Sequence, residues 1–177
     1  MLCEIPIIDL ELFCFVQCDL IIHSFQCLHS HRWNVTIIFE DDVRFVRDIA
    51  EKVRAAMDIL ESFESGWDLL YLGRIRNQAD MILSHVDLIV HPGYSYGTYA
   101  YAVSNKGVTK LLDAEPLANM IPLDEFLSVM YRQHPSIPAM AYGTENVLSA
   151  YAVQPSIALP IRAYSDTKTG NVVPRHT

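Results

Sequence analysis

The pattern of apolar and polar positions predicts a strand, an amphipathic helix and a second strand in the middle of the chain. The run Val35–Phe39 has the length and the β-branched, apolar composition of a buried strand. Across 48–65, apolar residues recur at helical spacing and form one stripe, which predicts a helix. The run Trp67–Leu72 is a second buried strand. Strands that are apolar on both faces are typical of parallel sheets, and this order is that of a βαβ unit with parallel strands.

The ends of the predicted helix carry recognisable signals. Asp48 is a suitable N-cap, and it is spaced for an ion pair with Lys52 one turn later. Gly66 is the residue expected just past the end of the helix.

Further elements follow toward the carboxyl end of the chain. We expect a short strand at Leu88–Val90 and an alternating strand at Thr98–Val103. Ser104 is placed as the N-cap of a short helix. Another helix starts directly after Pro122 and runs to Tyr131, and Val147–Val153 has the composition of a strand.

The first 33 residues give no clear pattern. Ile5–Ile8 and Leu10–Val16 fit either strands or a buried helix. All four cysteines lie within the first 27 residues, in spacings typical of neither a disulfide framework nor a zinc site. The apolar stretch there is interrupted by acidic residues and has no basic start, so we expect neither a signal peptide nor a membrane span in this chain.

Composition and charge narrow the class of protein. A chain of 177 residues corresponds to one domain, and its 51% hydrophobic and 19% charged content is that of a folded globular protein. The formal net charge of −8 disfavours a nucleic-acid partner. A protein of this charge handles anions only where a metal ion or local arginines reverse the sign.

Three adjacent acids, Glu40, Asp41 and Asp42, directly follow the first buried strand. In open α/β sheets, ligands bind outside the carboxyl ends of the strands. Mg²⁺ and Mn²⁺ prefer carboxylate oxygens and keep positions open for substrate phosphates. The acids are therefore either a metal site that holds a diphosphate or a solvated turn, and the pattern alone does not decide between them.

Other residues have two interpretations each. Arg74 and Arg76 follow the second strand and could bind a phosphate, or they could be surface charges. Tyr94 and Tyr96 offer flat faces suited to a sugar or a base, but tyrosines in a strand also fill cores.

Asp124 and Glu125 lie in the first turn of the last predicted helix. Acids there complement the helix dipole. The functional interpretation is that one of them is a general base held at a rigid helix start.

Several stretches, taken together and in order, resemble glycosyltransferase family 25, particularly its animal branch of procollagen galactosyltransferases and their cerebral endothelial cell adhesion relative. The resemblance covers roughly residues 35–168. Its motifs are Phe39–Phe45, Trp67–Arg74, Tyr94–Tyr96, Ala100–Tyr101, Val103–Ser104, Gly107, Lys110–Leu112, Ala114–Leu117, Leu123–Leu127, Val129–Met130 and His134–Pro135.

The resemblance implies an α/β fold of the GT-A type, a Rossmann-related mixed sheet flanked by helices. It implies transfer of galactose from UDP-galactose to a hydroxyl of a protein or glycan, such as collagen hydroxylysine, with Mn²⁺ or Mg²⁺ in the endoplasmic reticulum lumen. A carboxylate would deprotonate the acceptor in a single displacement with inversion.

The resemblance also implies roles for the candidate residues. The metal ligands would be Asp42, Asp41 and, from a Ser-Asp-Thr segment, Asp166. The general base would be Asp124 or Glu125. Residues that contact the substrates would be Glu40, Asp41, Arg74, Tyr94 and Tyr96.

The chain departs from the family pattern at two places. Gly97 stands where the family usually has Trp, which removes an aromatic wall. A Cys-x-x-Ser-His segment of the family is faintly matched by Cys27, Ser30 and His31. The stretch between this segment and the three acids is too short for the helix that the family usually has there. We therefore expect residues 1–33 to be atypical or mis-joined, leaving the fold incomplete on that side, with a transferase-like domain at 34–168 and a mobile tail at 169–177.

Two alternatives remain beside an active transferase. One is a catalytically inactive family member that acts as a lumenal or cell-surface binding or adhesion protein. The other, ranked last, is a phosphohydrolase that uses the acids for two-metal catalysis.

Overall fold

The computed structural model describes residues 34–64, 66–83, 88–116, 121–138, 141 and 147–161, together with residue 26 and the backbone of residues 11–12. The predictions made for Ile5–Ile8, for most of Leu10–Val16, for the cysteines and for the carboxyl-terminal tail fall on residues outside this description. Among the described residues, none of the helices is both long and apolar enough to cross a membrane.

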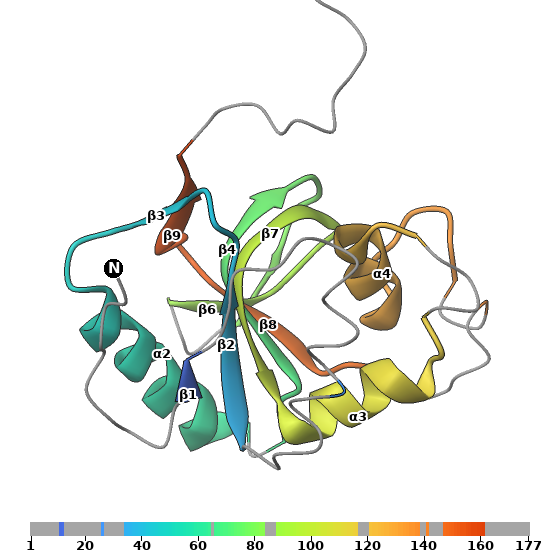
Figure 1. Ribbon diagram of the computed structural model, residues 1–177, viewed down its shortest axis with the longest axis horizontal. Coiled ribbons are helices and arrows are strands. Elements are labelled where there is room, and N and C mark those ends of the chain that lie inside the picture. Colours follow the sequence, from blue (N-terminus) through green and yellow to red (C-terminus); the bar gives the residue numbers. More distant parts are fainter. Residues whose placement is uncertain are drawn as a thin grey trace, which may run out of the picture.

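The fold is mixed α/β, which confirms the coarser part of the predicted fold class; the GT-A type stays a prediction. A seven-stranded sheet has the order β1-β2-β7-β4-β8-β6-β5, and a two-stranded sheet pairs β3 with β9 (Figure 1). The elements are β1 (Glu11–Leu12), β2 (Val35–Phe39), β3 (Val43–Phe45), α2 (Ile49–Phe63), β4 (Leu69–Arg76), β5 (Met81–Ile82), β6 (Ile89–His91), β7 (Ser95–Ser104), α3 (Asn105–Asp113), α4 (Leu123–Met130), β8 (Ala150–Val153) and β9 (Ala158–Pro160).

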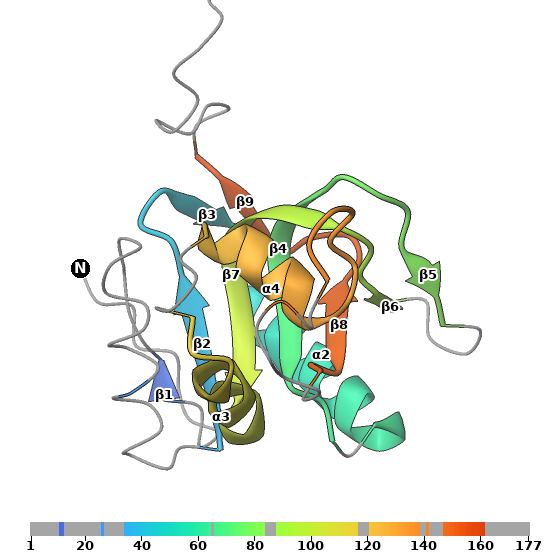
Figure 2. The ribbon, with the colours of Figure 1, turned by 90° about the vertical axis from the view of Figure 1, so that its right-hand side faces the viewer.

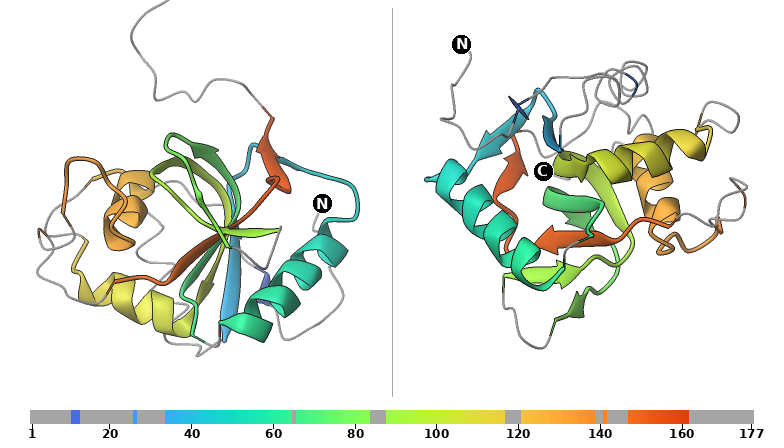
Figure 3. Two further views of the ribbon diagram at one scale, coloured as in Figure 1. Left: turned by 180° about the vertical axis from the view of Figure 1, so that it is seen from behind. Right: turned by 90° about the horizontal axis from the view of Figure 1, so that it is seen from below.

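Helix α2 covers one face of the large sheet, and α3 and α4 cover the other (Figures 1 and 3). The period of two along each strand divides the core accordingly. In β4, Leu69 and Tyr71 pack toward α3 and α4, whereas Leu70 and Leu72 pack toward α2. Helix α2 contributes Val53, Ala56, Met57 and Leu60, which are the buried members of its predicted apolar stripe.

The predicted strand-helix-strand order is present, but its two strands are not neighbours. Strand β7 lies between β2 and β4 and pairs antiparallel with both, so that β2 and β4 run parallel to each other one strand apart. Strand β7 extends beyond its predicted limits on both sides, to Ser95 and Ser104. No local pattern encodes this insertion, because it depends on pairing between segments far apart in the chain.

Strand β4 is longer than predicted and includes Gly73 and Arg74. Its register with β7 shifts around Gly73, which indicates an irregularity of the bulge type. A Cβ atom at this position would overlap the backbone carbonyl of Ala158, so the close approach of β9 requires glycine here.

The two predicted helix caps have different outcomes. Ser104 is an N-cap as predicted: its Oγ accepts a hydrogen bond from the Gly107 N–H at 3.0 Å. Asp48 occupies the N-cap position of α2 as predicted, but its backbone is left-handed (φ 60°) and its side chain makes no capping hydrogen bond. The ion pairs found among the described residues do not include one between Asp48 and Lys52. The C-cap of α2 is Glu64, so the helix ends earlier than predicted and Gly66 lies beyond its cap.

We expect Ser104→Ala to lower the free energy of unfolding by about 1 kcal/mol, because the Gly107 N–H loses its acceptor. Urea denaturation followed by circular dichroism measures this change. Ser104→Thr is the matched control, since it retains the hydroxyl oxygen and should unfold close to wild type. Equal losses in both variants would contradict the capping role.

Candidate active site

The three acids form the tight connection between the two sheets, at the carboxyl end of β2. The Glu40 N–H continues the ladder by donating to the Tyr99 carbonyl at 2.9 Å. The carbonyl of Asp42 accepts from the Ile161 N–H at 2.6 Å, next to the β3–β9 pair. Both sheets thus hold the turn by its backbone. Asp41 is exposed, whereas Glu40 and Asp42 are half-buried.

Glu40 lies in an unfavourable environment for a negative charge. Burial raises the pKa of its carboxyl, and the nearby Asp42, Asp124 and Asp41 carboxylates raise it further. A hydrogen bond from the Thr98 hydroxyl, at 3.4 Å, opposes the shift. We call Glu40, Asp41, Asp42 and Asp124 the carboxylate cluster. Its electrostatics favour the uptake of a proton or a cation.

Asp124 joins this cluster from α4, whose first turn comes close to β7. Its Oδ2 accepts from the Gly97 N–H at 3.2 Å, and its Oδ1 accepts from the Glu125 N–H at 2.9 Å. Gly97 has a left-handed backbone (φ 60°), a conformation that glycine adopts readily. Burial raises the pKa of Asp124, although these two N–H donors oppose the rise.

Helix α4 is held against β7 at several points. The Ser128 hydroxyl donates to the Ser95 carbonyl at 2.9 Å, and both residues are buried. The Tyr131 hydroxyl donates to the Gly93 carbonyl at 3.2 Å. This docking holds α4 beside β7, toward the end of the sheet at which β2 ends (Figure 2).

Glu125, the residue after Asp124, makes polar contacts with two other side chains. Its Oε2 accepts from the Tyr94 hydroxyl at 2.9 Å and lies 2.7 Å from His134 Nε2. The Tyr94 and His134 rings are in edge-to-face contact, with centroids 5.3 Å apart. Burial and Glu125 raise the pKa of Tyr94 to about 12, so its hydroxyl remains a donor at neutral pH.

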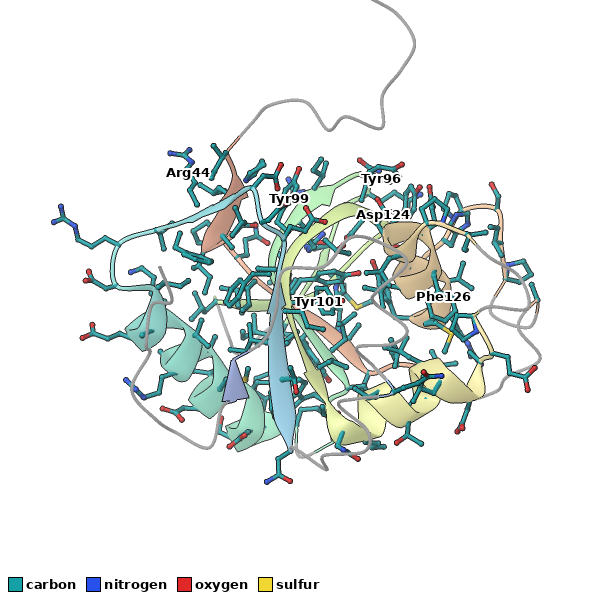
Figure 4. The ribbon with its side chains drawn as sticks, viewed as in Figure 1. Arg44, Tyr96, Tyr99, Tyr101, Asp124 and Phe126 are labelled. Atoms are coloured by element: carbon teal, nitrogen blue, oxygen red, sulfur yellow. The ribbon has the colours of Figure 1, made fainter. Side chains whose placement is uncertain are left out.

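Two further tyrosines border the cluster. The Asp124 carboxylate is the main cause of the raised pKa of Tyr96. The pKa of Tyr99 is raised mainly by burial, and the Glu40 and Asp42 carboxylates raise it further. Figure 4 shows Tyr96, Tyr99 and Asp124 along one edge of the molecule, whereas Tyr101 and Phe126 lie in its interior. Sequence reasoning missed Tyr99. The alternation in β7, which places it two positions after Gly97, was the available signal.

Arg74 has an internal role in this structure. Its guanidinium donates to Asp80 Oδ1 and to the Ser95 hydroxyl, both at 2.7 Å, and its side chain is 6% exposed. Asp80 Oδ1 also accepts from the Gly93 N–H at 3.0 Å. The ion pair therefore ties the segment after β4 to the start of β7. A role for Arg74 in binding substrate stays a prediction, and this geometry does not favour it.

The predicted metal ligands are only partly within the described residues. Asp41 and Asp42 are consecutive residues of the turn after β2, whereas Asp166 lies outside that part of the chain. Among the described residues, no group of three or more His, Cys, Asp or Glu side chains is arranged to hold a metal ion. Mg²⁺ often binds through one or two carboxylates and completes its shell with water and substrate phosphates. A metal site at Asp41 and Asp42 therefore stays a prediction.

The fold and this edge define an α/β protein with a candidate site rich in carboxylates and tyrosines. No protein-family model matches the chain. It is 37% identical over 134 residues to the inactive glycosyltransferase 25 family member 3 of Homo sapiens, covering 75% of this chain and 22% of that protein. It is 38% identical over 135 residues to procollagen galactosyltransferase 1-A of Xenopus laevis, with coverage of 75% and 22%.

A match to procollagen galactosyltransferase 1 of Danio rerio has 33% identity over 184 residues and covers 94% of this chain and 29% of the relative. By this homology the chain belongs to glycosyltransferase family 25. It spans less than a third of the length of these relatives. Their names divide between collagen galactosyltransferases and inactive members, so membership of the family does not decide activity.

We expect Glu40→Gln to raise the melting temperature near neutral pH. A raised pKa means that the folded protein binds this proton more tightly than the unfolded chain does. The resulting stabilisation is complete below the ordinary pKa of 4.5 and is lost as the pH rises through the folded value. Glutamine avoids the buried charge and retains an acceptor for Thr98.

Thermal unfolding at neutral pH and in acid measures this difference. The gain from Glu40→Gln should shrink in acid, where wild-type Glu40 is protonated. Asp58→Asn, at an exposed position in the middle of α2, is the charge-matched control and should change little. A gain of the same size at both pH values would show that ionisation of Glu40 is not its cause.

Proposed function

We propose that the protein is a divalent-cation-dependent glycosyltransferase that moves a sugar, galactose from UDP-galactose, to a hydroxyl of a protein or glycan such as collagen hydroxylysine. The convergence of Glu40, Asp41, Asp42 and Asp124 at the end of β2 is the main observation in support. Homology to the procollagen galactosyltransferases supports the choice of donor and acceptor, and the family resemblance supports a location in the endoplasmic reticulum lumen.

The proposed donor site lies at the turn after β2. Asp42 and Asp41 would hold Mn²⁺ or Mg²⁺, and Glu40 would face the ribose. The bound ion would supply positive charge that neutralises the diphosphate of the leaving group. Tyr96 and Tyr99 offer aromatic faces at the same edge for the sugar or the base, and Tyr99 provides an aromatic side chain near Gly97, where the family usually has Trp.

We assign the general base to Glu125 in preference to Asp124. Both oxygens of Asp124 accept backbone N–H groups, which gives this carboxylate a structural role in joining α4 to β7. Within the described residues, Glu125 Oε2 is hydrogen-bonded but Oε1 is not. Oε1 is therefore available to take the proton from the acceptor hydroxyl as that oxygen attacks the anomeric carbon and UDP leaves on the opposite face.

A second candidate is a binding protein on the same fold without catalysis. Two observations favour it: the described residues contain no three-ligand group, and inactive members of the family are among the similar relatives. Binding of collagen or glycan that survives EDTA, without transfer of sugar, would distinguish this candidate from the transferase.

For the transferase, we expect Asp42→Ala to weaken Mn²⁺-dependent binding of UDP at least about tenfold, because one carboxylate of a charge-assisted site is lost. Isothermal titration calorimetry with UDP, in Mn²⁺ and in EDTA, measures this effect. Asp58→Ala removes the same charge from an exposed face of α2 and should bind as wild type does. If the affinity for UDP changed neither in EDTA nor in Asp42→Ala, the proposed metal site would be ruled out.

We expect Glu125→Gln to lower the rate of sugar transfer by ~10²–10⁴-fold, the range for removal of a general base. The affinity for UDP should stay unchanged, since Glu125 does not contact the diphosphate in this proposal. Transfer from UDP-galactose to a collagen peptide, measured at saturating donor, tests this expectation. If Asp124→Asn abolished transfer while Glu125→Gln did not, the two roles would be reversed.

A further inference from the structure

His134 reaches Glu125 because the chain folds back after α4. The Gln133 and His134 N–H groups both donate to the Ser128 carbonyl, at 3.0 and 3.1 Å. Arg132 has a left-handed backbone (φ 61°) at this turn. The His134 side chain is thereby brought beside the first turn of the same helix and is only 8% exposed.

The backbone around His134 selects one tautomer of its imidazole. The N–H groups of Ser136 and Ile137 both point at Nδ1, at 3.1 and 2.8 Å. A nitrogen that accepts hydrogen bonds carries no proton, so the proton of the neutral ring lies on Nε2. Nε2 then donates to Glu125 Oε2 at 2.7 Å.

The same oxygen of Glu125 also accepts from the Tyr94 hydroxyl, at 2.9 Å. Two donors from different elements thus hold Oε2, whereas Oε1 has no hydrogen-bond partner among the described residues. This asymmetry orients the carboxylate. A functional group held in one orientation by surrounding hydrogen bonds reacts faster than one that must first be ordered.

We propose that His134 is a positioning residue: held in its Nε2–H tautomer by the backbone of Ser136 and Ile137, it orients the Glu125 carboxylate so that Oε1 faces the acceptor hydroxyl. This inference rests on the proposed transferase function. Both nitrogens of His134 are engaged within the protein, so the ring itself does not act on the substrate.

Two substitutions separate positioning from a purely structural role. In His134→Asn, the amide oxygen can take the place of Nδ1 and keep the Ser136 and Ile137 bonds, but the bond from Nε2 to Glu125 is lost and only Tyr94 still holds Oε2. In His134→Gln, the amide nitrogen can take the place of Nε2 and keep the bond to Glu125, while the backbone acceptor is lost. His134→Asn therefore keeps the conformation of the loop, whereas His134→Gln keeps the orientation of the Glu125 carboxylate.

We expect His134→Asn to keep its melting temperature and to lose transfer ~10–100-fold in kcat, with an unchanged KM for UDP-galactose. We expect His134→Gln to unfold at a lower temperature and to keep most of its kcat. Transfer kinetics and thermal unfolding of the same preparations provide both readouts. A kcat that follows stability in both variants would overturn the positioning role, because that is the behaviour of a merely structural residue.

Nitrogen NMR of histidine-labelled protein gives a readout that needs no activity. The His134 signals, identified by their loss in His134→Asn, should be those of a protonated Nε2 and an unprotonated Nδ1. A proton on Nδ1 would overturn the inference and leave the proposed function standing. Wild-type protein that neither binds UDP nor transfers sugar would overturn the proposed function itself, and the positioning role with it.

Discussion

The pairing of β7 with two neighbours at once is the constraint on which the structure depends. Its carboxyl-terminal half pairs with β2 on one side and with β4 on the other, from Ala100 to Val103. Alternate residues of this stretch are buried in the two cores of the sheet. A shift of one residue in register would exchange the two faces and expose both sets. Because β7 lies between them, the positions of β2 and β4 are determined together.

The same strand also connects the candidate site to the rest of the fold. Its amino-terminal half supplies Thr98 to Glu40, Gly97 to Asp124 and the backbone of Ser95 to Ser128. The carboxylates of β2 and α4 are therefore brought together through one strand rather than by a single loop. Burial, together with the repulsion of these neighbours, raises the pKa of Glu40, and its charged form disfavours the folded state at neutral pH. Binding of a cation or a proton would reduce this unfavourable electrostatic energy.

Local patterns predicted much of this fold. The β-branched run of β2, the apolar stripe of α2 and the helix after Pro122 were recognised because each is a short-range, periodic feature. The side-chain cap expected from Asp48 is absent because the residue before α2 takes a left-handed backbone, which its sequence neighbours do not reveal. Arg74 was interpreted as a surface or ligand residue because its partner, Asp80, follows a strand end that sequence reasoning placed too early.

By itself, the sequence determined the α/β class, the three acids after β2, the acidic pair that begins α4 and, through its motifs, the relationship to glycosyltransferase family 25. Only the tertiary structure decided how these parts act on one another. It separated Asp124, both of whose oxygens accept backbone N–H groups, from Glu125, which has one oxygen engaged by Tyr94 and His134. The reason is physical: residue types follow local composition, whereas orientation and electrostatic environment arise from contacts between segments that the chain brings together only on folding.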